Sequence, residues 1–387
     1  MRHSEDRILV SHAGVLPRPE ALLALMADSS TPVEEVESAL PAAVQEVVRH
    51  QLETGIDVVN DGELSKAAGF SSYVRDRMTG IEQRELRPGE TPRTPNKRDQ
   101  RDFPGFYATG LGQPRSSRFR VRGAAGSTNP QSCVGPLSYI GKEAVQRDIR
   151  NLLAALPGPD VEAFLPAVAP GTVEHWLWNE YYPDDESFLY AIADVLHEEY
   201  LEITNAGLVI QIDDPDLPDG WQAHPEMDVA TYHRFAKTRV EALNHALDGI
   251  PEHLVRFHIC WGSQHGPHKD DIPLREIIDL VLEVHAECYS IEAANPTHEH
   301  EWRIWEEVSL PDGKSLMPGV VGHASDLIEH PQLVAQRLER VARLVGRENV
   351  IAGTDCGLAS RVSHPEICWA KLTSLAEGAR LASQALW

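Results

Sequence analysis

The chain has 387 residues, of which 42% are hydrophobic and 24% charged, so it is long enough for one large barrel or two ordinary domains with a sizeable core. It carries 35 Lys and Arg against 59 Asp and Glu, a formal net charge of −24. A surface this acidic repels phosphate backbones and anionic lipids, which disfavours nucleic acids and membranes as partners.

The N-terminal stretch and the cysteines indicate a cytoplasmic protein. MRHSEDRILVSHAG has no apolar signal core, and no run of about twenty apolar residues occurs in the chain. The five cysteines are odd in number and scattered, which argues against a disulfide framework and leaves thiols available to a metal. They are Cys133, Cys260, Cys288, Cys356 and Cys368.

Short apolar runs alternate with longer amphipathic segments along the chain. In the first part, strands are predicted at 8–14, 58–63 and 133–140, and helices at 33–55 and 142–156. Gly55 is expected to end the first of these helices. Further on, strands are predicted at 164–171, 208–215, 254–262, 289–296, 318–326 and 351–358, and helices at 185–207, 229–250, 273–288 and 330–350.

This repeated alternation of strand and helix predicts an α/β fold. So many repeats favour a closed (β/α)8 TIM-type barrel, occupying residues 1–387 as one catalytic domain, over an open doubly wound sheet. Neither a glycine-rich dinucleotide fingerprint nor a phosphate-binding P-loop is present, which weakens the open-sheet alternative further.

Residues 84–130 break the alternation. Their Pro, Gly, Arg and Ser content fits neither the helical nor the strand period, so we predict a long irregular insertion on the barrel. A solvated loop, a lid and a subunit contact remain open as its role.

Polar residues end almost every predicted strand, and in a TIM-type barrel the reactive side chains lie at those ends. His258 and Cys260 alternate along 254–262, so both side chains point to the same side of a strand. The complete set is His12, Asp61, Glu63, Asp213, Asp214, His258, Cys260, Glu292, His323, Asp355 and Cys356.

Four of these residues form a tetrahedral ligand set for zinc. They are His258, Cys260, Glu292 and Cys356. Two thiolates donate charge to the metal and soften it, which favours holding a substrate thiolate for alkylation over activating water. The alternatives are a helix-capping role for Glu292, a packing role for Cys356, and a closed structural zinc site.

Short motifs around these residues resemble those of the cobalamin-independent methionine synthases, specifically their C-terminal catalytic barrel. The zinc motifs of that family match HIC (258–260), SIEA (290–293) and TDCGL (354–358), in the same order. Further matches are AGVLPRP (13–19), DGE (61–63), IQIDDP (210–215) and VVGH (320–323).

The resemblance implies roles for individual residues. Glu63 and Asp213 match the carboxylates that bind the amino group of homocysteine, and we expect His12 to join them in the substrate site. His323 matches the histidine that protonates the leaving group of the methyl donor. Trp178 falls where an indole stacks on the pterin of methylfolate, although Trp176 is equally near and a packing role is open.

One departure from the family pattern bears on the substrate. Val15 stands where the family usually has a serine that helps to hold the homocysteine carboxylate, so the thiol acceptor need not be homocysteine. Single-barrel relatives include epoxyalkane:coenzyme M transferases, which join a thiol to an epoxide. Arginines of the insertion that could meet a sulfonate or carboxylate are Arg115, Arg118, Arg120 and Arg122.

The sequence therefore predicts a zinc-dependent transferase that methylates a homocysteine-like thiol. The first alternative is addition of coenzyme M to an epoxide. The second is a lyase resembling the uroporphyrinogen decarboxylases, whose barrel is related and which needs no zinc. A homodimer is the default expectation for the assembly.

Overall fold

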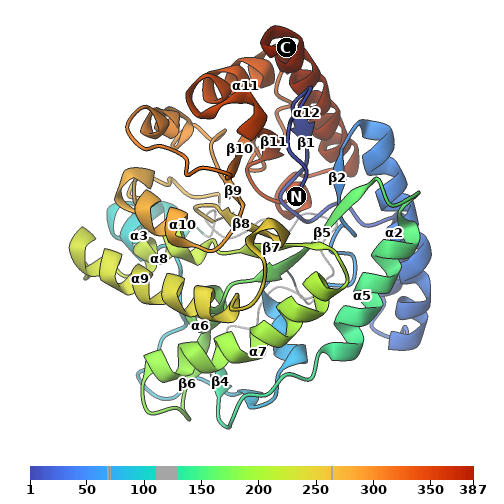
Figure 1. Ribbon diagram of the computed structural model, residues 1–387. Coiled ribbons are helices and arrows are strands. Elements are labelled where there is room, and N and C mark those ends of the chain that lie inside the picture. Colours follow the sequence, from blue (N-terminus) through green and yellow to red (C-terminus); the bar gives the residue numbers. More distant parts are fainter. Residues whose placement is uncertain (68, 70, 110–128, 263–264) are drawn as a thin grey trace.

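Eight parallel strands form a nearly closed barrel in the computed structural model, which describes residues 1–67, 69, 71–109, 129–262 and 265–387 (Figure 1). The barrel strands are β1 Leu9–Val10, β2 Val58–Val59, β5 Glu162–Val168, β7 Val209–Asp213, β8 Val255–Ile259, β9 Cys288–Ile291, β10 Ser315–Val321 and β11 Ile351–Thr354. The predicted TIM-type barrel is confirmed.

The strand order β1-β11-β10-β9-β8-β7-β5-β2 leaves one seam, between β1 and β2. Hydrogen bonds cross it: the Asp57 amide donates to the Val10 carbonyl at 2.9 Å, and the Ser11 hydroxyl donates to the Val58 carbonyl at 3.0 Å. The central strands are buried along their whole length because helices cover one face and the barrel interior the other, which explains why apolar residues predominate in them.

Helices surround this barrel (Figure 1). They are α1 Glu20–Ala27, α2 Val33–Thr54, α5 Lys142–Ala155, α6 Pro170–Trp176, α7 Asp185–Asn205, α8 Asp216–Ala223, α9 Val229–Ala246, α10 Ile278–Glu283, α11 Pro331–Val345 and α12 Pro365–Leu386. The 3-10 turns are η1 Ser72–Arg77, η2 Glu252–Leu254, η3 Leu274–Glu276, η4 Glu299–Glu306, η5 Arg347–Asn349 and η6 Leu358–Ser360.

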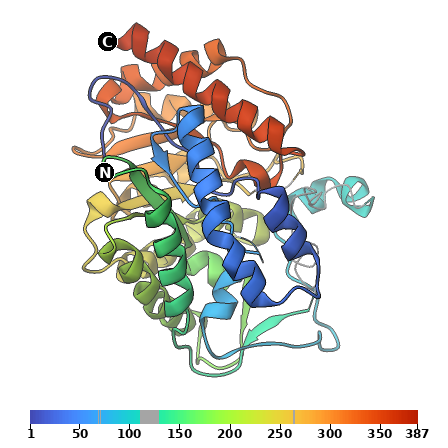
Figure 2. The ribbon, with the colours of Figure 1, turned by 90° about the vertical axis from the view of Figure 1, so that its right-hand side faces the viewer.

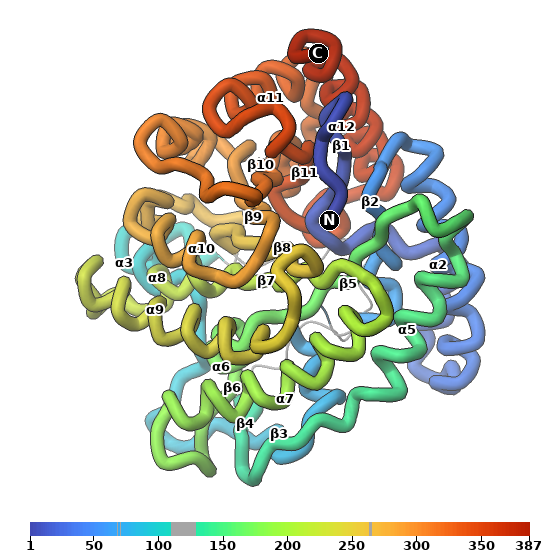
Figure 3. The backbone as a smooth tube through the Cα atoms, viewed as in Figure 1, coloured from blue at the N-terminus to red at the C-terminus, as the bar shows by residue number. Residues whose placement is uncertain are grey.

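The outer helices pack against their neighbours in space. Figure 2 shows α2 and α5 side by side, and Figure 3 shows β1 beside α12. Gly55 ends α2 in the left-handed conformation with φ 96°, as predicted. None of the described helices has the length and apolarity that crossing a bilayer requires.

A second, three-stranded sheet lies outside the barrel. It is made of β3 Ile81–Gln83, β4 Gln131–Cys133 and β6 Leu177–Asn179, with β3 antiparallel and β6 parallel to β4. The predicted strand at 133–140 was therefore wrong. The strand that is present, β4, ends at Cys133, and Gly135 and Pro136, which do not favour strand structure, come soon after it. The predicted helix at 273–288 is also shorter, since it is divided into η3 and α10.

The described part of the insertion, 84–109, contains α3 Lys97–Asp102 and α4 Pro104–Ala108. The Arg98 guanidinium attaches α3 to the barrel by donating to the carbonyls of Trp221, at 2.7 Å, and His224, at 2.8 Å. The arginines Arg115, Arg118, Arg120 and Arg122 lie outside the described residues. The role of the insertion as a lid or subunit contact stays a prediction.

Candidate functional site

Three of the four predicted zinc ligands meet where β8 and β11 end. The Sγ atoms of Cys260 and Cys356 are 3.8 Å apart, and these two atoms and a ring nitrogen of His258 all lie within 4.8 Å of one another. Two sulfurs bound to a tetrahedral zinc at about 2.3 Å are about 3.8 Å apart, so the spacing of the thiols fits such an ion.

The ring of His258 is oriented toward this cluster by its neighbour on β9. Its Nδ1 is 2.9 Å from the Ser290 hydroxyl, whereas the buried Nε2 has no hydrogen-bond partner among the described residues. An unpartnered nitrogen in a buried site is costly. The arrangement of one ring nitrogen held by a hydroxyl and the other left for a metal is the usual one for a histidine ligand.

The surroundings shift the pKa values of the two thiols in opposite directions. Cys260 donates to Cys356, and this hydrogen bond, together with His258 and His323, lowers the pKa of Cys356 although burial opposes it. The same bond and burial raise the pKa of Cys260. Burial lowers the pKa of His258, but its interaction with the neighbouring Cys356 outweighs burial and raises it. Cys356 is thus the more acidic thiol of the pair, and the thiolate is the form that binds metals.

The fourth predicted ligand, Glu292, lies in an adjoining group with His323 and Asp355, whose ligand atoms are also within 4.8 Å of one another. Its Oε2 accepts from the Trp261 amide at 2.7 Å, and its Oε1 accepts from the Asn295 side chain at 2.5 Å. The structure therefore brings three predicted ligands together and holds the fourth beside them.

His323 is 1% exposed, and neither of its ring nitrogens has a hydrogen-bond partner in the described part of the chain. Asp355 accepts from the amides of Ala293, at 2.9 Å, and Ala294, at 2.7 Å. Burial raises the pKa of Asp355, and the charge of Glu292 raises it further. His323 is thus a buried imidazole whose nitrogens are available to a ligand.

Glu63 and Asp213, the predicted substrate carboxylates, are both buried, and Asp213 is the register partner of His258 between β7 and β8. Burial raises the pKa of Asp213 to about 7; His258 and Lys66 oppose this shift and Glu63 adds to it. Lys66 was not identified from the sequence. The sequence offers one sign of its role, its position three residues after Glu63, and this spacing is too common to be informative.

His12, which was predicted to join the substrate site, has both ring nitrogens engaged by the chain, and its contact with a substrate stays a prediction. Its Nε2 is 2.9 Å from Gln51 Oε1, and its Nδ1 accepts from the Gly14 amide at 3.3 Å. Burial lowers its pKa to about 4, so the ring is neutral. With both nitrogens engaged by the chain, His12 holds the loop that carries Gly14.

Trp178 belongs to β6 of the small sheet and not to a barrel strand. The guanidinium carbons of Arg84 and Arg93 lie 5.1 and 5.3 Å from the centre of its ring. Trp176 is 39% exposed, at the end of α6. The stacking of either indole on a substrate stays a prediction.

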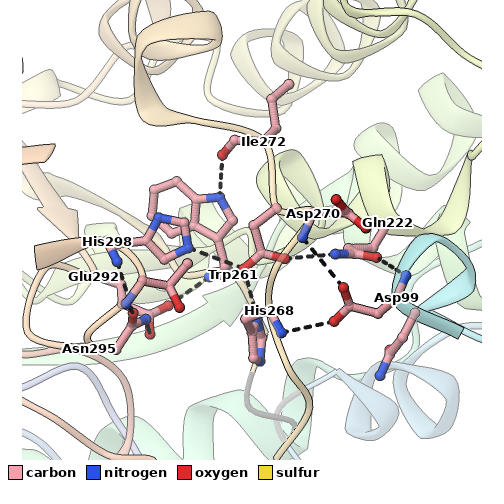
Figure 4. Close-up of polar contacts among 12 residues, drawn as sticks. Asp99, Gln222, Trp261, His268, Asp270, Ile272, Glu292, Asn295 and His298 are labelled. Atoms are coloured by element: carbon pink, nitrogen blue, oxygen red, sulfur yellow. Dashed lines mark hydrogen bonds and ion pairs between the residues drawn. The ribbon is translucent and has the colours of Figure 1, made fainter. Parts of the chain in front are cut away.

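A polar network supports Glu292 through Trp261 and Asn295 (Figure 4). The Trp261 ring stacks on the His298 ring at 3.9 Å, and its Nε1 donates to the Ile272 carbonyl at 2.7 Å. His298 in turn lies between two carboxylates, 3.1 Å from Asp271 and 2.8 Å from Glu301. The amide that holds Glu292 is thereby fixed.

The same network reaches the insertion. Asp99 of α3 accepts from the amides of His268, at 2.8 Å, and Asp270, at 3.4 Å, while Gln222 donates to Asp271 at 2.9 Å (Figure 4). The insertion therefore holds residues 268–271 in place. Through Asp271 and His298, these contacts extend to Trp261, the residue after Cys260.

Comparison with known proteins identifies the family to which the chain is related. The family model described as the catalytic domain of cobalamin-independent synthase matches residues 169–380. A methionine synthase of Pyrococcus horikoshii is 27% identical over 224 residues, which span 57% of either chain. The methionine synthase of Thermococcus kodakarensis is 24% identical over 382 residues, covering 96% of this chain and 93% of the relative.

Among solved structures, the chain is similar to a B12-independent methionine synthase from Shewanella sp. W3-18-1, which was determined in complex with selenomethionine. The TM-score is 0.71 at 20% identity, and the match covers 98% of this chain and 99% of the other. This likeness supports the same barrel fold.

Proposed function

Because the chain belongs to the family of cobalamin-independent synthases, we propose that it is a zinc-dependent transferase that methylates the sulfur of a homocysteine-like thiol. The observation that carries this proposal is the convergence of His258, Cys260 and Cys356 from two strand ends, with the two sulfurs 3.8 Å apart.

The two thiols and the imidazole determine which reaction a bound zinc ion would favour. A zinc ion bound there would supply a soft, electron-rich centre that lowers the proton affinity of an acceptor thiol and leaves its sulfur nucleophilic. Cys356 and Cys260 would hold it by sulfur and His258 by Nε2, while the Ser290 hydroxyl keeps the imidazole in place.

Glu292 is the proposed fourth ligand. Its carboxylate is held next to the cluster by the amide after Cys260, the Trp261 N–H, and by Asn295. A carboxylate with two alternative hydrogen-bond donors can leave a metal without becoming a buried unpaired charge. Glu292 can therefore give way to an incoming thiol.

His323 is the proposed general acid. Its buried ring has nitrogens without partners among the described residues, and it lies within 4.8 Å of Glu292. From that position it would donate a proton to the group that leaves when the methyl is transferred. For the donor we propose methylfolate, with Trp178 as the candidate stacking residue.

Glu63 and Asp213 are proposed to face the end of the acceptor remote from its sulfur. Asp213 lies beside His258 in the sheet, and the charge of Glu63 acts on Asp213, so both carboxylates adjoin the metal cluster. His12 contributes indirectly by holding the Gly14 loop.

A transfer assay tests the proposed function. Zinc-loaded protein is incubated with a panel of short thiols that includes homocysteine, together with methyltetrahydrofolate, and the S-methylated product is measured by mass spectrometry. We expect product from at least one thiol, and its loss in Cys356→Ser but not in Cys133→Ser, which changes a buried thiol of the small sheet. Equal rates in Cys356→Ser and the unaltered protein would contradict the proposal.

A further inference from the structure

A polar pair lies in the barrel interior, one layer deeper than the strand ends that carry the proposed site. Gln211 of β7 is the register partner of Arg256 of β8. Two residues further along the same strands, Asp213 is the register partner of His258. Because side chains alternate along a strand, Gln211 points to the same side as Asp213. Branched apolar side chains usually fill this layer of a TIM-type barrel, so the pair is unusual there.

Arg256 is a buried cation, 1% exposed. Its guanidinium donates to the Gln211 side chain at 2.7 Å, to the Ser11 hydroxyl at 2.9 Å and to the His12 carbonyl at 3.2 Å. These acceptors are uncharged. Burial lowers the pKa of Arg256 to about 10, so the guanidinium is still charged at neutral pH. Holding a cation in the core by neutral acceptors is costly, and such a cost is typical of a functional position.

Arg256 fixes the orientation of the Gln211 amide. A guanidinium has donors only, so the amide oxygen of Gln211 must face Arg256 and its Nε2 must face away. This Nε2 donates to Asp213 Oδ1 at 2.7 Å and to the Ala13 carbonyl at 3.1 Å. A flipped amide would place its oxygen against the carboxylate instead. Arg256 therefore sets the direction of the hydrogen bond by which Gln211 holds Asp213.

The same pair also holds the loop that follows β1. Its two side chains bond to consecutive carbonyls, those of His12 and Ala13. Gly14 comes next, and a Cβ there would lie 2.6 Å from Glu63 Oε1, so only glycine lets the loop approach this carboxylate so closely. The pair thus contacts Asp213 directly and reaches Glu63 through the loop.

Resting on the proposed function, we infer that Gln211 and Arg256 are positioning residues for an acceptor that carries an amino group. Together they fix the two carboxylates proposed to face the far end of the acceptor, Glu63 and Asp213. An ammonium makes charge-assisted hydrogen bonds to both carboxylates only when both are held in the right orientation. The amino group should therefore strengthen binding, and this gain should depend on Gln211.

Two thiols that differ only in the amino group test this inference. Homocysteine and 4-mercaptobutanoate are titrated separately into the zinc-loaded full-length protein, and each dissociation constant is measured by isothermal titration calorimetry. We expect homocysteine to bind at least about tenfold more tightly than 4-mercaptobutanoate. The preference is then compared between variants, so that intrinsic differences between the two thiols cancel.

Gln211→Met keeps the size of the side chain and removes the donor to Asp213. The preference should fall to about twofold or less, while the dissociation constant of 4-mercaptobutanoate changes by less than about threefold, because that thiol has no amino group. A merely structural role would weaken both thiols alike. The control is Gln146→Met: Gln146, on the outer helix α5, also donates to a carboxylate, that of Glu202 at 2.9 Å, and its variant should keep the preference.

A second variant covers a failure of Gln211→Met to fold, which circular dichroism detects. In Gln211→Glu the new carboxylate pairs with Arg256 and keeps the cation satisfied, but it cannot donate to Asp213. We expect this variant to fold and the preference to fall by at least about fivefold.

The outcomes separate the two proposals. Equal binding of the two thiols by the unaltered protein overturns the positioning role and leaves the thiol transferase intact. A preference that persists in a folded variant of Gln211 also overturns it. If neither thiol gives a binding signal, the proposed thiol site fails and this inference fails with it.

Discussion

The indole of Trp261 lies flat on the imidazole of His298, with ring centres 3.9 Å apart and planes 22° from parallel. Trp261 follows Cys260 directly, and its backbone amide donates to Glu292 at 2.7 Å. The stack therefore fixes the position of a residue that touches both a proposed sulfur ligand and the proposed carboxylate ligand. Stacking on a protonated ring adds a cation–π contribution to the packing of the two rings.

Replacing His298 with alanine should loosen this support. Asp271 and Glu301 would lose this partner but keep others, His268 and Gln222 for Asp271 and the Leu274 amide for Glu301, so we expect a loss of about 1–3 kcal/mol in the free energy of unfolding. Zinc affinity should fall by about tenfold or more, because the partners of a metal ligand set its orientation. Chelator competition measures the affinity and urea denaturation the stability. His300→Ala, which changes an exposed histidine of η4, the 3-10 helix that follows His298, is the control, and a zinc affinity equal in both variants would refute the positioning role.

The charge of His298 should make stability depend on pH. Burial lowers its pKa, but hydrogen bonds to Asp271 and Glu301 outweigh burial and raise the pKa to about 9. Because the folded-state pKa is raised above the unfolded value of about 6.5, the stabilisation is complete below about pH 6.5 and is lost as the pH rises through 9. The unfolding free energy of the unaltered protein relative to His298→Ala should decrease by up to about 3 kcal/mol between pH 6 and pH 10. A difference that stays constant over this range would show that folding does not raise the pKa of His298.

The barrel was predictable because its strands are buried on both faces and its helices are amphipathic, so both leave a clear pattern. The proximity of His258 and Cys260 at the end of β8 was predictable for the same reason, since strand alternation places both on one face. The small sheet was not, because β3, β4 and β6 are three residues long and too short to show a period.

Contacts that depend on loop paths could not be derived from the sequence. The side chain of Glu292 accepts hydrogen bonds from Trp261 and Asn295. Nothing in the motif SIEA (290–293) indicates these two donors. The position of Lys66 against Pro166 depends on how β2 and β5 pack and on the left-handed turn at Glu63. His298 falls outside every motif, because its role comes from stacking on a residue 37 positions earlier in the chain.

Gly14→Ala should disturb Glu63 directly. The new Cβ would meet Glu63 Oε1 at 2.6 Å, at a φ of 131° that alanine tolerates poorly. We expect a loss of about 1–3 kcal/mol in stability and about a tenfold loss in thiol affinity. Gly249→Ala is the matched control, since Gly249 also has a positive φ, 73°, and nothing within 4 Å of the added carbon. It should lose stability by a similar mechanism but keep its thiol affinity; equal thiol affinity in both variants would argue against Glu63 as part of the acceptor site.

Zinc content tests the central claim most directly. Purified protein, dialysed against buffer without metal, is analysed by inductively coupled plasma mass spectrometry for the unaltered chain, His258→Ala, Cys356→Ser and the control Cys133→Ser. The convergence of His258, Cys260 and Cys356 predicts about one zinc per chain in the unaltered protein and the control, and less than about a fifth of that in the two ligand variants. Full zinc occupancy in both His258→Ala and Cys356→Ser would contradict the account.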